Sequence, residues 1–103
     1  MKEVDYSYSV TREDKIRVFF RKNRGKITHF IVQYYALIHA RWRTIMRIDT
    51  CHGYPHKHTY HLRDRETVLV LGTMESSNFA FTESRQFIHD NFTKIKENYL
   101  IAK

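Results

Sequence analysis

Several residue types are scarce in this chain of 103 residues, and each scarcity excludes a class of protein. The single cysteine cannot close an intrachain disulfide, so a reducing, cytoplasmic location is predicted. Three glycines and one proline argue against disorder, collagen-like repeats and low-complexity linkers. The longest apolar-leaning run, FIVQYYALI, is far short of the roughly 20 residues that cross a bilayer, so no membrane partner is predicted. The start, MKEVDYSYSV, has acidic and hydroxyl side chains where a signal peptide would be apolar.

Carboxylates are absent from residues 15–48, although the whole chain contains 11 of them. The net charge of +7 therefore concentrates in the middle of the chain, which predicts one electropositive face. Such a face, interleaved with aromatic residues, is typical of RNA or DNA binding, because cations that neutralise phosphates release counterions. A solvated face or an acidic protein partner is the alternative. The nine basic residues of this block are Lys15, Arg17, Arg21, Lys22, Arg24, Lys26, Arg41, Arg43 and Arg47.

The remaining composition is that of a small globular protein. Hydrophobic residues make up 42% of the chain and aromatic residues 15%. A chain of this length can bury one core but has no room for two. We therefore predict a single domain spanning residues 1–103.

Alternation of apolar and polar residues predicts strands joined by tight turns. In VDYSYSV, every second residue from Val4 to Val10 is apolar or aromatic. The segment KIRVFFR alternates similarly, and in the following KNRGK Gly25 suits a hairpin turn because glycine accepts positive φ. Further strands are expected at residues 27–38, 42–50 and 66–72. This pattern predicts an antiparallel meander.

The periodicity changes near the C-terminus. From Thr82 onward, apolar residues recur at intervals of four, three and four positions, at Ile88, Phe92, Ile95 and Tyr99. This spacing lines one face of an α-helix, with Thr82 expected as its N-cap. A short helix at residues 11–15 is an additional option. The predicted fold class is α+β, a twisted antiparallel sheet of about five strands with one long C-terminal helix packed on it.

Simple alternation predicts the two faces of the strand at residues 42–50. The core face would carry Trp42, Thr44, Met46 and Ile48. The other face would carry Arg43, Ile45, Arg47 and Asp49. Arg43 is therefore expected beside Arg47, where both could meet the same phosphate.

The segment CHGYPHKHTYH, residues 51–61, holds four of the seven histidines together with the only cysteine and the only proline. Histidines two apart on an extended segment point the same way, so a metal ion such as zinc could be bound. His-x-His also arises on any polar strand face, so this metal site is the alternative interpretation and no cofactor is predicted. Its ligands would be His52, His56 and His58, joined by Asp49.

The same histidines suit cleavage of RNA without a metal. Such cleavage needs a base for the 2′-hydroxyl, an acid for the leaving oxygen and cations for the phosphate. Imidazole can serve as both acid and base, because its unperturbed pKa is about 6.5. The predicted catalytic residues are His52, His56, His58, Asp49 as an orienting group and Arg47 as a phosphate contact. The predicted nucleic-acid-binding residues are Arg21, Arg24, Arg41, Arg43, Lys57 and Tyr60.

At these residues the chain resembles the TumE-type toxins of type II toxin-antitoxin modules. The string RIDTCHGYPHKHTY, residues 47–60, is similar to their signature, in which a strand ending in Asp leads to a His-Gly loop and a His-x-His segment. The likeness covers mainly residues 34–60, and the loop departs from the pattern by a shorter spacer. The resemblance implies a growth-inhibiting toxin that acts on RNA and is paired with a helix-turn-helix antitoxin. The matching residues are Asp49, His52, Gly53, His56 and His58.

These observations predict an RNA-binding protein that acts as a toxin-like, metal-independent endoribonuclease. The predicted partners are RNA and an antitoxin protein, and a homodimer is compatible with the sequence. Two alternatives stay open at this point. One is a non-catalytic module that binds nucleic acid or a protein partner, and the other is a His-ligated metal-binding protein.

Overall fold

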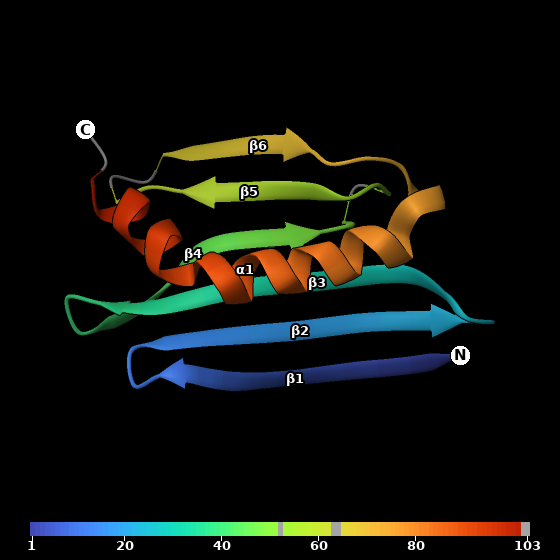
Figure 1. Cartoon of the computed structure of the whole chain (residues 1–103), viewed down its shortest axis with the longest axis horizontal. Helices are drawn as coiled ribbons and strands as arrows, with labels where there is room; N and C mark the ends of the chain where they lie inside the picture. Colours follow the sequence, from blue (N-terminus) through green and yellow to red (C-terminus); the bar gives the residue numbers. More distant parts are fainter. Residues whose placement is uncertain (52, 63–64, 102–103) are drawn as a thin grey trace.

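A computed structural model describes residues 1–51, 53–62 and 65–101 of the chain. It contains a six-stranded antiparallel sheet in which the strand order follows the chain, crossed on one face by a single long helix (Figure 1). The predicted α+β class is confirmed, with one strand more than expected. The elements are β1 (Lys2–Thr11), β2 (Asp14–Asn23), β3 (Lys26–Ile38), β4 (Arg41–Asp49), β5 (His56–Tyr60), β6 (Glu66–Val70), a 3-10 turn η1 (Met74–Ser76) and α1 (Ser77–Leu100).

The hydrophobic core lies between α1 and the middle strands of the sheet. Alternate residues of β2 and β3 point toward the helix, as their sequence periodicity predicts, and α1 packs mainly on β3 and β4. Burial of this apolar surface is the main force that holds the helix on the sheet. The fully or nearly fully buried residues include Ile16, Val18, Phe30, Val32, Tyr34, Ile48, Ile88 and Ile95.

The opposite face of the sheet carries no helix, and we call it the open face (Figure 1). Here β1 supplies carboxylates to the cations of β2. Arg17 forms an ion pair with Asp5 at 3.0 Å, and Arg21 forms one with Glu3 at 3.1 Å. The charge of these two arginines is therefore offset by carboxylates of the preceding strand, outside the carboxylate-free block. This part of the open face is not the electropositive surface that the block predicts.

A β-bulge in β4 overturns the predicted faces of that strand. Tyr34 pairs with Met46 but Tyr35 pairs with Thr44, so Ile45 is an extra residue without a partner. Odd- and even-numbered residues of β4 therefore exchange faces across the bulge. Trp42 and Thr44 lie on the open face rather than in the core. The predicted faces of Trp42, Arg43 and Thr44 were therefore wrong. Arg43 pairs with the buried Ala36 and lies on the helix side, not beside Arg47. Ile45, predicted on the face opposite to the core, is fully buried.

The histidine-rich segment contains a strand that was not among the predicted ones. Residues His56–Tyr60 form β5, which pairs His56 with Asp49 and His58 with Arg47. Gly53, at φ 85°, lets the chain turn between β4 and β5. The five residues of β5 read as polar in sequence because its buried positions are histidines.

Two further boundaries differ from the prediction. The helix begins at Ser77, not after Thr82, whose hydroxyl donates to the carbonyl of Asn78 inside the helix. Ser77 is fully buried and donates to the carbonyl of Ile27, which attaches the start of the helix to the sheet. The short helix considered at residues 11–15 is absent, since β1 and β2 are joined there by a tight turn.

The C-terminal helix is amphipathic in character and contains charged residues along its length. Within the described part of the chain, no helix has an apolar stretch long enough to cross a bilayer.

Candidate functional site

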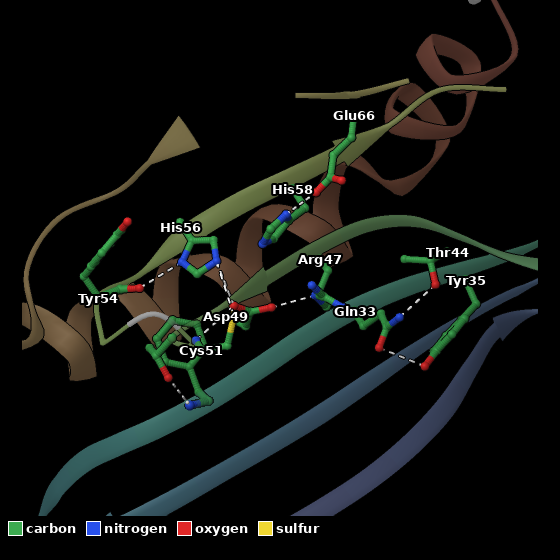
Figure 2. Close-up of polar contacts among 12 residues, drawn as sticks. Gln33, Tyr35, Thr44, Arg47, Asp49, Cys51, Tyr54, His56, His58 and Glu66 are labelled. Atoms are coloured by element: carbon green, nitrogen blue, oxygen red, sulfur yellow. Dashed lines mark hydrogen bonds and ion pairs between the residues drawn. The ribbon is translucent and has the colours of Figure 1, made fainter. Parts of the chain in front are cut away.

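A polar cluster occupies the open face where β4 meets β5. Arg47 and Asp49 come from β4, and His58 and His56 are their direct partners across the ladder. Directly opposed residues of an antiparallel pair project on the same side, so the four side chains meet. Figure 2 shows them on the side of the sheet away from α1. Their site is largely closed to solvent, with Asp49 2%, His56 1% and His58 6% exposed.

Asp49 is the centre of this cluster. One carboxylate oxygen, Oδ2, lies 2.6 Å from Nε of Arg47, and Oδ1 lies 3.1 Å from Nε2 of His56. The backbone N–H of Cys51 also donates to Oδ1, at 3.1 Å. Burial alone would raise the pKa of Asp49, but the hydrogen bonds from Cys51 and the charges of Arg47 and His56 outweigh it and hold the pKa below its usual range. Asp49 is therefore an anion at neutral pH.

The two imidazole rings are oriented by separate contacts. Nδ1 of His56 lies 3.0 Å from the carbonyl oxygen of Tyr54, while Nδ1 of His58 contacts a carboxylate oxygen of Glu66 (Figure 2). The ring centroids are 4.6 Å apart and nearly perpendicular, at 69°. Nε2 of His58 is buried and has no hydrogen-bond partner among the residues that the structure describes.

Cys51 adds a sulfur to the cluster. Its Sγ lies 3.7 Å from Nε2 of His56, and the residue as a whole is exposed. Partial desolvation and the adjacent Asp49 carboxylate raise the pKa of the Cys51 thiol. An unliganded Cys51 is therefore a thiol at neutral pH and a poor nucleophile.

The closed geometry bears on the chemistry predicted from the motif. A general acid or base must lie within about 3 Å of the proton that it transfers. Both rings are buried in the described arrangement, so cleavage of RNA by His56 or His58 would require the site to open. His52, also predicted to be catalytic, lies outside the described residues, so its role stays a prediction.

A metal ion is the other chemistry that this cluster can support. Asp49, Cys51, His56 and His58 each offer one ligand atom, and these atoms all lie within 4.8 Å of one another. The predicted metal set contained His52 in place of Cys51. Cys51 was missed because a lone cysteine has no spacing pattern, and only the bond from its backbone to Asp49 places it here.

The predicted nucleic-acid-binding residues do not form one surface. Lys57 faces the helix side, with Nζ 5.2 Å from the ring centroid of Phe87. Arg24 lies in the β2–β3 turn, at the end of the sheet opposite to the β3–β4 turn where Arg41 begins β4 (Figure 1). Arg21 is paired with Glu3. Only Arg41, Arg43 and Tyr60 lie toward the same end.

At that end a cleft of about 410 Å³, here called the Trp42 cleft, is lined by polar and aromatic side chains. Trp42 is 42% exposed, and Nζ of Lys15 lies 4.4 Å from the centroid of its ring. Nε of Arg43 is buried without a hydrogen-bond partner among the described residues. The lining residues are Trp42, Arg43, Thr44, Tyr60, His61, Glu66 and Tyr99.

Sequence reasoning assigned Trp42 to the core because the bulge at Ile45 leaves no trace in the apolar pattern. In the sequence, the feature that could have indicated an exposed Trp42 was its position between two arginines, in RWR.

Comparison with known proteins identifies a family but no characterised relative. The family described as Domain of unknown function (DUF7718) matches residues 1–103, so the chain belongs to this family. No curated protein and no solved structure matches the chain.

Proposed function

We propose that this member of the DUF7718 family binds single-stranded RNA in the Trp42 cleft. The observation that carries the proposal is an exposed tryptophan that shares a cleft with an arginine whose Nε has no partner among the described residues. Nucleobases stack on aromatic rings, and phosphates accept hydrogen bonds from guanidinium groups. One cleft thus offers both kinds of contact.

Trp42 is the stacking group of this proposal. Its ring lies on the open face and has Lys15 above it, so a base that stacks there also meets a positive charge. Stacking on an aromatic side chain is worth about 1 to 3 kcal/mol per base. Tyr60 offers a second ring in the same cleft, and burial raises the pKa of its hydroxyl although the charge of Arg47 opposes this. The hydroxyl therefore stays protonated and can donate a hydrogen bond.

Arg43 is the phosphate contact. A buried N–H without an acceptor costs about 1 to 3 kcal/mol, and a phosphate oxygen in the cleft would remove this cost. Glu66 lines the same cleft with an opposing charge, but its carboxylate is engaged by His58. The net charge of +7 further favours a polyanion over a neutral ligand.

The protein provides its own probe for this binding, because Trp42 is the only tryptophan. We expect single-stranded RNA to quench Trp42 fluorescence, with an affinity that falls as salt rises. Arg43→Gln should weaken binding about tenfold or more. Lys57→Gln is the matched control, since it removes the same charge from a position outside the cleft and should leave the affinity within about twofold.

Three results would contradict the proposal. They are no quenching by RNA, an equal loss of affinity in both variants, and equal binding of DNA of the same sequence. The last would remove the assignment to RNA, because the site would then not recognise the 2′-hydroxyl that DNA lacks.

Cleavage of RNA by the histidine cluster stays a separate prediction. RNA incubated with the purified protein, with and without chelator, would show it directly. A 2′,3′-cyclic phosphate on the product would indicate attack by the substrate's own hydroxyl, as metal-independent cleavage requires. Intact RNA, or cleavage at the parent rate by folded His56→Ala and His58→Ala variants, would contradict this prediction.

A further inference from the structure

One ring nitrogen of His58 has no hydrogen-bond partner among the described residues. Nδ1 of His58 is held by Glu66, and the opposite nitrogen, Nε2, is buried without a hydrogen-bond partner among the described residues. Figure 2 shows Nε2 on the side of the ring that faces Asp49 and His56. Leaving such a group unsatisfied costs about 1 to 3 kcal/mol, so a ligand at this point would stabilise the site.

His56 and Asp49 lie beside this nitrogen of His58. The Tyr54 carbonyl can only accept, so Nδ1 of His56 carries a hydrogen, and the other ring nitrogen, Nε2, points to Asp49. The distance from Nε2 of His56 to a carboxylate oxygen of Asp49 is 3.1 Å. This contact does not reach Nε2 of His58, which is still unsatisfied among the described residues. A metal ion could bind both rings and the carboxylate together.

We propose that Asp49, Cys51, His56 and His58 bind one zinc-class transition-metal ion. The four ligand atoms are within 4.8 Å of one another. Two imidazoles, one sulfur and one carboxylate form a donor set that suits Zn²⁺ and disfavours Mg²⁺ and Ca²⁺, which prefer oxygen ligands only. This site is distinct from the Trp42 cleft and does not depend on RNA binding.

The distances require a modest contraction on binding. Zinc bonds of about 2.0 to 2.3 Å place tetrahedral ligand atoms about 3.3 to 3.8 Å apart, so the widest separation must close by about 1 Å. Cys51 is exposed and lies in the connection between β4 and β5, so it can move without disturbing the core. The two histidines and Asp49 are held in register by the β4–β5 ladder.

The surroundings of the four ligands also fit a metal centre. Metal-binding histidines usually donate their second nitrogen to a carboxylate or a carbonyl, and here Glu66 serves His58 and the Tyr54 carbonyl serves His56. Charges balance as well. The Asp49 and Glu66 carboxylates and a Cys51 thiolate are neutralised by Arg47 and a divalent ion. The thiol would release its proton when the metal binds.

Titration of the metal-free full-length protein with Co²⁺ tests the proposal without any assay of activity. Tetrahedral coordination with a thiolate should produce d–d bands and a sulfur-to-cobalt charge-transfer band at one equivalent, and Zn²⁺ should displace both. Cys51→Ala should abolish the charge-transfer band, and because Cys51 is exposed this variant should remain folded. Glu66→Gln should weaken binding about 10- to 100-fold.

Two matched variants distinguish metal binding at this site from nonspecific metal binding at the surface. His29→Gln removes another histidine of the open face, and Glu3→Gln removes another carboxylate there; both should bind Co²⁺ like the parent. Absence of the tetrahedral bands, or equal binding by His58→Ala and His29→Gln proteins, would overturn the proposal. Unchanged Zn²⁺ affinity in Cys51→Ala would exclude the sulfur and thereby the four-ligand site as stated.

Discussion

The two sides of β4 hold the same strand in place by different means. On the helix side, Met46 and Ile48 pack into an apolar core with Ile88 and other residues of α1. On the open side, Arg47 and Asp49 join a buried polar cluster that depends on a few directional contacts. Apolar packing tolerates small shifts and is independent of ligands, whereas buried polar groups are stable only when each finds a partner. One side of the strand thus stabilises the fold, and the other offers a site.

The largest loss of stability is expected on the helix side. Ile88 is fully buried between α1 and the sheet. Ile88→Ala should lower the free energy of unfolding by about 2 to 5 kcal/mol through lost apolar burial and a new cavity, as measured by urea denaturation. Phe79→Ala on the exposed face of the same helix is the control and should change it by about 0.5 kcal/mol or less. Similar losses in both variants would mean that α1 does not pack through Ile88.

A somewhat smaller effect is expected on the open side, and it should affect binding as well as stability. Asp49→Ala leaves Arg47, His56 and the N–H of Cys51 without their common acceptor, which should destabilise the metal-free protein by about 2 to 4 kcal/mol. Asp5→Ala is the control, since Asp5 pairs with Arg17 on the exposed surface and its loss should have much less effect. Equal losses in urea denaturation would remove Asp49 as the organiser of the cluster.

A buried carboxylate on the helix side, that of Asp14, predicts a dependence of stability on acid. Asp14 is buried there and accepts hydrogen bonds from Tyr34 and Thr11, with Nζ of Lys96 3.4 Å away and Glu13 adjacent. Burial alone would raise the pKa of Asp14, but these partners outweigh it and lower the pKa from 3.8.

The lowered pKa of Asp14 determines how stability changes with pH. Stability contributed by the ionised Asp14 is fully present above its unfolded pKa and is lost as the pH falls through the lower folded value. Asp14→Asn should cost about 1 to 2 kcal/mol at neutral pH and should flatten the decline in stability below pH 4, measured by urea denaturation at a series of pH values. An unchanged acid profile would contradict this role of Asp14.

The smallest effect is expected at the edge strand β6. Val68 is 54% exposed and lies on the open face, since it pairs with His58 across the β5–β6 ladder. Val68→Ala should change the free energy of unfolding by about 0.5 kcal/mol or less at every protein concentration. A larger loss that grows with dilution would show instead that Val68 is covered in a second copy of the chain, and would support the homodimer predicted from the sequence.

Periodicity predicted the helix side well, because that side is built from apolar alternation. β1 to β3 follow a pattern of two, and the residues from Ile88 to Tyr99 of α1 follow a pattern of about 3.6, as buried faces impose. The start of the helix was placed too late, since Ser77 is buried by a bond to Ile27 that no local pattern announces.

The open side could be predicted only in part. Arg47, Asp49, His56 and His58 were expected in one site because they are close in sequence, and the β4–β5 ladder does bring them together. The contribution of Glu66 depends on the pairing of β5 with β6. The exposure of Trp42 depends on a bulge opposite Tyr34 and Tyr35. Both are consequences of register between strands, which alternation within one strand does not specify.

The most direct test of the metal site uses this difference between the two sides of β4. Thermal unfolding is followed with chelator and with a slight excess of Zn²⁺, for the parent, for Ile88→Val and for His58→Ala. A metal bound only by the native state should raise the unfolding temperature of the parent and of Ile88→Val by similar amounts and leave that of His58→Ala unchanged. An equal rise in all three proteins, or no rise in the parent, would contradict zinc binding by the cluster.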